Sequence, residues 1–114
     1  MANLPEETIT IVLNLQRRLL QLINEATAAG FIILEQYGET KATILDLELL
    51  QNARERTTSY YVRLYRLLLQ IAESQPAATS ATLNLLDQSI AQTQAIADAS
   101  QATIQEAKRD WNIS

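Results

Sequence analysis

Hydrophobic residues repeat at alternating spacings of three and four along three long segments of the chain, residues 5–37, 40–74 and 77–112. This spacing gathers apolar side chains on one face of an α-helix, which turns once per about 3.6 residues. At ~1.5 Å of rise per residue, each segment would form a rod of roughly 50 Å. The pattern therefore predicts three long helices.

The few residues that break regular backbone lie close to the ends of these segments. Pro5 and Pro76 stand near the starts of the first and third segments, and Gly38 is suited to end the first in a left-handed conformation. Residues suited to cap the helix starts are Asn3, with Glu6 completing a capping box, then Thr40, and Thr79 or Ser80. Gly30 lies inside the first segment, where it either breaks the helix or admits a close neighbour.

Loops of only a few residues force consecutive helices to lie antiparallel. We therefore expect residues 1–114 to form a single all-α domain, an antiparallel up-down-up bundle of three long helices. Self-association into a homodimer could complete this bundle.

The expected core follows one stripe on each segment. In the first it comprises Ile9, Val12, Gln16, Leu19, Ile23, Ala26, Gly30, Ile33 and Tyr37, broadened by Leu15, Leu22 and Ala29. In the second it comprises Leu50, Ala53, Thr57, Tyr60, Leu64, Leu67, Leu68 and Ile71, with a further stripe at Ile44, Leu47, Val62, Tyr65 and Leu69. In the third it comprises Leu83, Leu86, Ile90, Thr93, Ala97, Ser100, Ile104, Ala107 and Trp111. The opposite face of the first segment is expected to be polar, with Ile32 as the exception.

The middle of the second segment is polar. Between Gln51 and Ser59 the one hydrophobic residue is Ala53, and in a hairpin about Gly38 this stretch lies opposite residues 17–25. A solvated middle with weak surface ion pairs is the interpretation we favour. The alternative is a buried polar layer that fixes helix register or binds a ligand.

Two helix faces are candidate interaction surfaces. The first is a line of small residues on the weakly charged third segment: Ala91, Ala95, Ala99 and Ala102. Alanine is also the best helix former at exposed positions, so this line has a purely structural interpretation as well. The second is an outer face of the second segment that carries Arg56, Arg63 and Arg66 among tyrosines. Such a face can bind phosphates or stack on bases, although neighbouring acidic residues favour a solvated surface and make a nucleic-acid partner unlikely.

The amino-acid composition excludes most kinds of catalytic site. The chain has no Cys and no His, so it lacks a thiolate nucleophile, the usual general base and the commonest transition-metal ligand. Its acidic residues form no inward-facing pair at helical spacing. With a net charge of −4, it also lacks a generally basic surface. We therefore expect no enzyme activity, no cofactor and no metal.

The chain shows no targeting pattern. Residues 1–7 lack the basic start of a signal peptide, and the longest nearly uncharged apolar run, residues 26–34, is far shorter than the roughly 20 residues that span a bilayer. We expect a cytoplasmic helical protein that scaffolds or assembles through a helix face, with itself or a protein partner. The alternatives are a nucleic-acid- or phosphate-binding accessory protein and an amphipathic membrane-associated protein.

Overall fold

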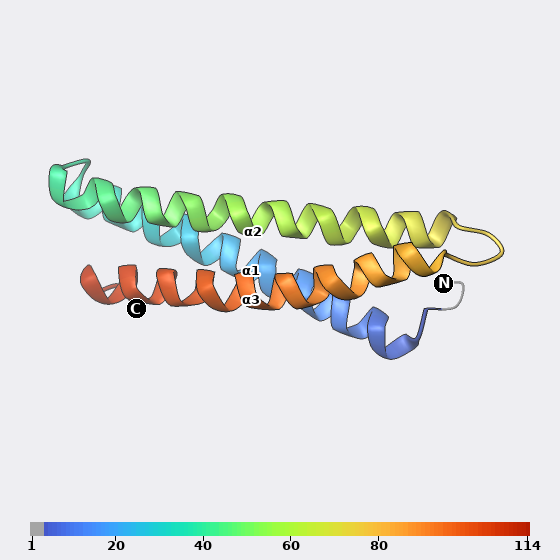
Figure 1. Cartoon of the computed structure of the whole chain (residues 1–114). Helices are drawn as coiled ribbons and strands as arrows, with labels where there is room; N and C mark the ends of the chain where they lie inside the picture. Colours follow the sequence, from blue (N-terminus) through green and yellow to red (C-terminus); the bar gives the residue numbers. More distant parts are fainter. Residues whose placement is uncertain (1–3) are drawn as a thin grey trace.

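A computed structural model of the protein describes residues 4–114 and has three helices in this range. These are α1 (Glu6–Tyr37), α2 (Lys41–Glu73) and α3 (Ser80–Asp110). They run up, down and up in an elongated bundle of 56 × 19 × 18 Å (Figure 1). The predicted three-helix antiparallel architecture is confirmed, although α3 begins three residues later than expected, at Ser80 instead of residue 77.

The start of α1 lies within one residue of the predicted segment 5–37. Pro5 occupies the cap position in an extended conformation, with φ −63° and ψ 146°, and no side chain caps the helix there. The Pro5 carbonyl accepts hydrogen bonds from the N–H groups of Thr8 (3.1 Å) and Ile9 (3.2 Å). The helix begins at Glu6, directly after Pro5, because the proline ring presets a φ that is compatible with a helix start. The cap expected at Asn3 stays a prediction. Asn3 itself lies outside the described residues.

The connection between α1 and α2 agrees with the sequence. Gly38 has φ 71° and ψ −174°, a region essentially restricted to glycine, and its N–H bonds the Leu34 carbonyl at 3.0 Å. Thr40 then caps α2: its Oγ1 accepts from the Thr43 N–H at 3.2 Å, while Thr43 Oγ1 accepts from the Thr40 N–H at 2.8 Å. Thr43 Oγ1 also donates to the Gly38 carbonyl at 2.8 Å. The two threonines therefore join the turn to the first turn of α2.

The start of α3 is capped by Thr79, whose Oγ1 accepts from the Thr82 N–H at 3.2 Å. This confirms the later of the starts considered from the sequence. Residues 77–79 consequently belong to the α2–α3 connection and not to the helix.

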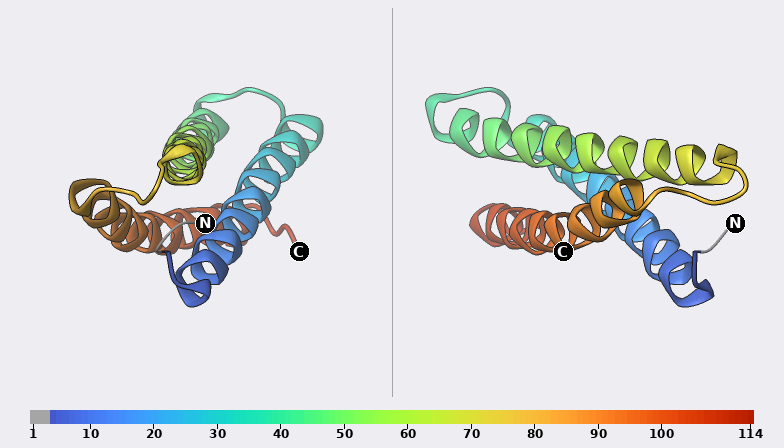
Figure 2. Two further views of the ribbon diagram at one scale, coloured as in Figure 1. Left: turned by 90° about the vertical axis from the view of Figure 1, so that its right-hand side faces the viewer. Right: turned by 45° about the vertical axis from the view of Figure 1, so that its right-hand side comes forward.

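The three helices pack around a narrow core, with α1 inclined to the other two (Figure 2). The buried residues of α1 are Val12, Leu15, Leu19, Leu22, Ala26, Ala29 and Ile33. Gln16, Ile23 and Gly30, expected at the centre of this stripe, are half-buried, and Tyr37 is exposed. Val12, Leu19 and Ile33 of the predicted stripe are completely buried, and Leu15, Leu22 and Ala29, predicted to broaden it, are buried beside them.

The cores of α2 and α3 are close to the prediction. The buried residues of α2 are Thr43, Leu50, Ala53, Thr57, Leu64, Leu67 and Ile71. The buried residues of α3 are Leu86, Ser89, Thr93, Ala97, Ser100, Ile104 and Ala107. Much of the α3 stripe is small, so the neighbouring helices approach it without large side chains between them. In the further stripe on α2, Ile44, Tyr65 and Leu69 are exposed, whereas Leu47 and Val62 are half-buried.

Trp111 joins the end of α3 to the hairpin. Its indole Nε1–H donates to Asp46 Oδ2 at 2.6 Å, and its ring lies 4.9 Å from the Tyr37 ring, centroid to centroid. These contacts link residues from all three helices at the Gly38 end of the bundle.

Replacing Gly30 by alanine should stabilise the protein by about 0.5–1 kcal/mol. The helix is continuous at this position, and the nearest atom to an added Cβ is Leu47 Cδ2 at 4.0 Å. Gly38→Ala is the matched control and should destabilise by about 1 kcal/mol or more, because its φ of 71° is strained for alanine. Urea unfolding followed by circular dichroism measures both. Destabilisation by Gly30→Ala would mean that α2 lies closer to Gly30 than described.

Replacing Asp46 by alanine should lower the unfolding free energy by about 1–2 kcal/mol, because it removes a charged acceptor from a half-buried indole N–H. Emission of Trp111, the single tryptophan, should shift to the red as the ring gains solvent. Glu48→Ala removes an exposed carboxylate from the same helix and should change stability by less than about 0.5 kcal/mol. Equal effects of the two variants would contradict this role for Asp46.

Candidate interaction surfaces

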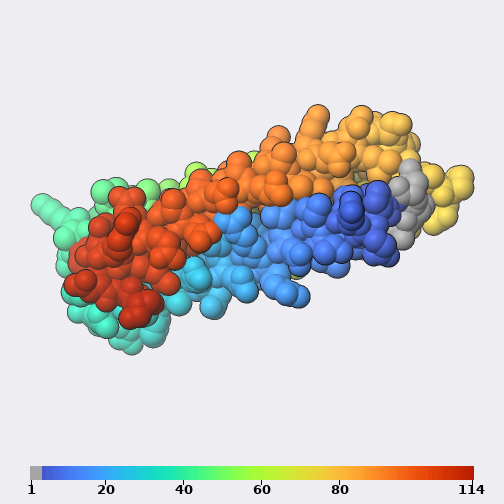
Figure 3. All heavy atoms as spheres, turned by 90° about the horizontal axis from the view of Figure 1, so that it is seen from below, coloured from blue at the N-terminus to red at the C-terminus, as the bar shows by residue number. Residues whose placement is uncertain are grey.

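The line of alanines on α3 is at the surface. Ala91, Ala95, Ala99 and Ala102 are all exposed. Seen from below, α3 lies along α1 over much of the bundle (Figure 3). The helix thus presents these small residues outwards, and their use as an interaction face stays a prediction.

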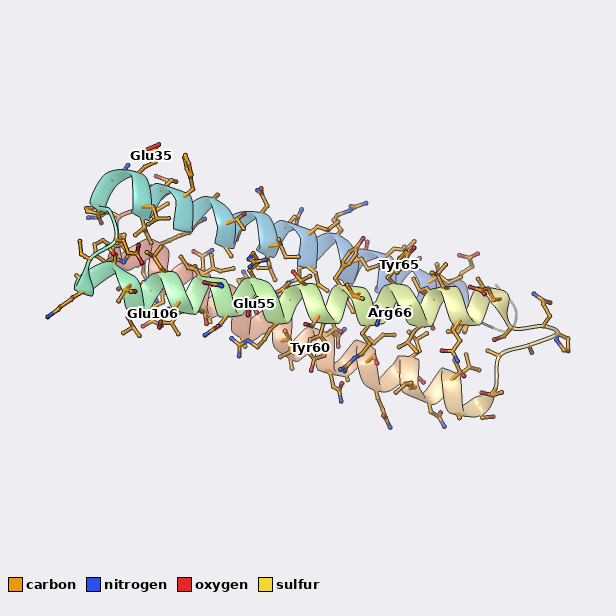
Figure 4. The ribbon with its side chains drawn as sticks, turned by 90° about the horizontal axis from the view of Figure 1, so that it is seen from above. Glu35, Glu55, Tyr60, Tyr65, Arg66 and Glu106 are labelled. Atoms are coloured by element: carbon orange, nitrogen blue, oxygen red, sulfur yellow. The ribbon has the colours of Figure 1, made fainter. Side chains whose placement is uncertain are left out.

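The arginine face of α2 is also exposed at Arg56, Arg63 and Arg66. Arg63 is held in place: its Nη1 donates to Gln92 Oε1 of α3 at 3.0 Å, and its guanidinium lies 4.8 Å from the centre of the Tyr60 ring. Tyr60 lies on the α3 side of α2, whereas Tyr65 lies on the α1 side (Figure 4). The interleaved arginines and tyrosines therefore do not form one surface, and Arg63 connects two helices.

The polar middle of α2 is solvated, except for Ala53 and Thr57, which are buried. Thr57 Oγ1 donates to the Ala53 carbonyl at 2.5 Å and lies 3.3 Å from Ser100 Oγ of α3. Every buried side-chain nitrogen or oxygen in residues 4–114 has a hydrogen-bond partner. The solvated middle and the buried polar layer considered from the sequence thus occupy different sides of α2. Its outer side faces solvent, and its inner side places the hydroxyl of Thr57 next to that of Ser100.

A second polar contact joins α1 to α3 near the same level. Arg18 Nη2 lies 2.8 Å from Asp98 Oδ1 and 2.6 Å from Gln101 Oε1. The Asp98 side chain is 74% exposed, so the pair is screened by solvent and contributes little stability. The contact nevertheless marks the level at which α1 lies next to α3, because Arg18 of α1 reaches both Asp98 and Gln101 of α3.

Four of the exposed apolar residues that the sequence analysis missed lie on the outer face of α1; others are Leu45 and Leu49 on α2 and Leu85 on α3. Leu13 is 53% exposed, Leu20 51%, Phe31 64% and Leu34 48%. They belong to what we call the outer seam, seven positions at alternating spacings of four and three: Leu13, Arg17, Leu20, Asn24, Thr27, Phe31 and Leu34. The prediction of a polar face broken by Ile32 is wrong, since Ile32 is half-buried. The seven-residue spacing of Leu13, Leu20 and Leu34 was the signal that could have identified this seam.

A shallow groove borders the outer seam at Gly30. It runs between α1 and α2, with Phe31 and Leu34 on one side and Leu47 and Leu50 on the other. Because Gly30 has no side chain, the groove is open at this point, and one end of the seam is continuous with apolar atoms of α2.

Residues 4–114 contain no group of three or more acidic, His or Cys side chains placed to hold a metal ion. No helix in this range is long and apolar enough to cross a bilayer.

No protein family, curated protein or solved structure matches this chain. Its function is therefore argued from its own residues and from the surfaces described above.

Replacing Thr57 by valine together with Ser100 by alanine should change stability by less than about 1 kcal/mol, because both hydroxyls are removed at once and no buried group loses its partner. Ser100→Leu should instead destabilise by about 1–3 kcal/mol, since Ser100 is fully buried between α2 and α3. Thermal unfolding of the three proteins measures this difference. A large loss in the double variant would show that the hydroxyl pair, and not the size of these side chains, sets the helix register.

Proposed function

We propose that this protein is a non-catalytic interaction or assembly protein whose working surface is the outer seam of α1. The observation that carries the proposal is the exposure of four large apolar side chains, 48–64% each, along one side of a single helix. Soluble monomers rarely expose extended apolar patches, and such patches mark interaction sites.

The energetics favour covering this seam. Burying a large apolar side chain completely contributes about 1.5–3 kcal/mol, so covering one that is half exposed contributes about 1 kcal/mol. The polar positions Arg17, Asn24 and Thr27 lie among the apolar ones. A mixture of large apolar anchors with a few polar groups is typical of protein interfaces that form and dissociate.

The two faces expected from the sequence offer less to a partner. The alanines of α3 each present a single methyl group, which gives little area to bury. On α2, Arg63 already donates to Gln92 and lies over Tyr60, so a phosphate would compete with these contacts for its guanidinium.

The alternatives also have less support from the charge pattern. Helices that lie on membranes carry Lys and Arg along their polar face, whereas the outer side of α1 carries Arg17 with Glu35. The proposal involves no catalytic step, cofactor or metal, in keeping with a chain that has no His and no Cys.

The test is affinity capture with chemical cross-linking in an extract of the native host. The tagged protein is compared with Leu20→Glu on the outer seam and with Ala95→Glu on α3, which are both single charges added at exposed helix positions. Cross-links from α1, to an untagged copy or to another protein, should be lost with Leu20→Glu and retained with Ala95→Glu.

Circular dichroism of each variant should show unchanged helicity, which makes a loss of cross-links attributable to the surface. Dependence on Ala95 instead would assign the function to the α3 face. Cross-links that survive both substitutions would contradict the proposed function. Salt-dependent binding to an oligonucleotide that is lost with Arg66→Gln would favour the nucleic-acid alternative.

A further inference from the structure

We propose that the outer seam of α1 binds the same seam of a second copy of this chain, with the two α1 helices antiparallel. This inference rests on the proposed function, because it names the occupant of the same surface. It follows from three features of the seam: its spacing, the order of apolar and polar residues along it, and the positions of its charges.

The spacing is that of a helix that packs against another helix. The seven positions from Leu13 to Leu34 alternate in steps of four and three, the pattern that allows knobs-into-holes packing between helices. The seam runs for ~32 Å along α1 at 1.5 Å per residue. It lies on the side of the helix opposite the core stripe, so a second helix can bind without displacing α2 or α3.

The middle of the seam, from Leu20 to Phe31, matches itself when reversed. Outside this part, Arg17 of one copy faces Leu34 of the other, and Leu13 has no facing residue on the seam. In an antiparallel pair whose centre lies between Asn24 and Thr27, Leu20 of one copy faces Phe31 of the other, and this contact occurs twice. Asn24 of each copy then faces Thr27 of the other, so the two polar side chains can hydrogen-bond across the centre. A polar residue in an apolar seam favours the registers that place it opposite another polar residue, and this register does so while also setting Leu20 against Phe31.

The charges select the antiparallel direction. Arg17 and Glu35 are exposed, and neither makes an ion pair with another residue of the described chain. In the register above, Arg17 of one copy lies beside Glu35 of the other. A parallel pair would instead place Arg17 beside Arg17 and Glu35 beside Glu35, and like charges at such positions are destabilising. An unrelated partner or a lipid surface would need no such two-fold match.

The first experiment measures the mass of the purified protein by sedimentation equilibrium. The wild type should sediment as a concentration-dependent dimer, at twice the 12.8 kDa of the chain. Leu20→Glu should weaken the dimer at least tenfold, because the substitution places a carboxylate against Phe31 at two sites. Ala95→Glu, at an exposed position on α3, should leave it unchanged. A wild type that stays monomeric at high concentration overturns the inference.

The second experiment tests the direction of the pair and uses the absence of cysteine from the chain. Arg17→Cys and Glu35→Cys are prepared separately, mixed, and treated with a short bis-maleimide. The mixture should give a cross-linked dimer, and each variant alone should not, since identical positions would lie more than ~20 Å apart along the pair. In the mixed dimer, the copy with Arg17→Cys keeps Glu35 and the copy with Glu35→Cys keeps Arg17, so one of the two contacts between Arg17 and Glu35 stays intact. Cross-linking of each variant alone would show a parallel pair and overturn the inference.

The third experiment tests the charge match. Arg17→Glu should weaken the dimer about tenfold at low salt, and Arg17→Glu combined with Glu35→Arg should restore it. Failure of the second substitution to restore the dimer contradicts the proposed register.

If the purified chain is monomeric while capture from the host still depends on Leu20, the second copy is excluded and the proposed function stands with a different partner. If neither the dimer nor the capture from the host depends on Leu20, both the antiparallel dimer and the proposed function are contradicted.

Discussion

A bundle only 19 × 18 Å across has room for a single layer of side chains between its three helices. Each helix can therefore bury one stripe of residues, and everything outside that stripe faces solvent or a partner. The small residues of α3, including Thr93, Ala97 and Ser100, make this layer thinner still. This geometric limit accounts for the unusual feature of the protein, which is that large apolar residues are present both in the core and on the outer side of α1.

Polar contacts set how the helices lie along one another. The threonine caps join each connection to the helix that follows it, and Trp111 with Asp46 closes the Gly38 end. In the middle, Arg18 reaches from α1 to α3, and Arg63 reaches from α2 to the same helix. These contacts are individually weak because most are exposed to solvent. Together they make one register between the helices more favourable than its neighbours, which an apolar stripe of similar residues would not do by itself.

Local signals were sufficient for the helix ends and for the core of two helices. Gly38, Thr40 and Thr79 could be recognised because caps and turns depend on the chemistry of neighbouring residues. The start of α1 at Glu6, directly after Pro5, likewise follows from the fixed φ of proline. The outer seam was missed because its leucines are separated by Arg17, Asn24 and Thr27, and the stronger core stripe accounted for the periodicity of the helix.

The amino-acid order alone was enough to establish three long helices, their antiparallel arrangement and the small core of α3, because these follow from periodicity and from short connections. Only the tertiary structure showed that α1 carries a second apolar stripe and that α2 and α3 leave it uncovered. Leu15 and Leu20 are equally hydrophobic, and the choice between them depends on where α2 and α3 lie around α1. The arrangement found leaves Leu20 and Phe31 at the surface, which the spacing of the leucines in the sequence did not by itself establish.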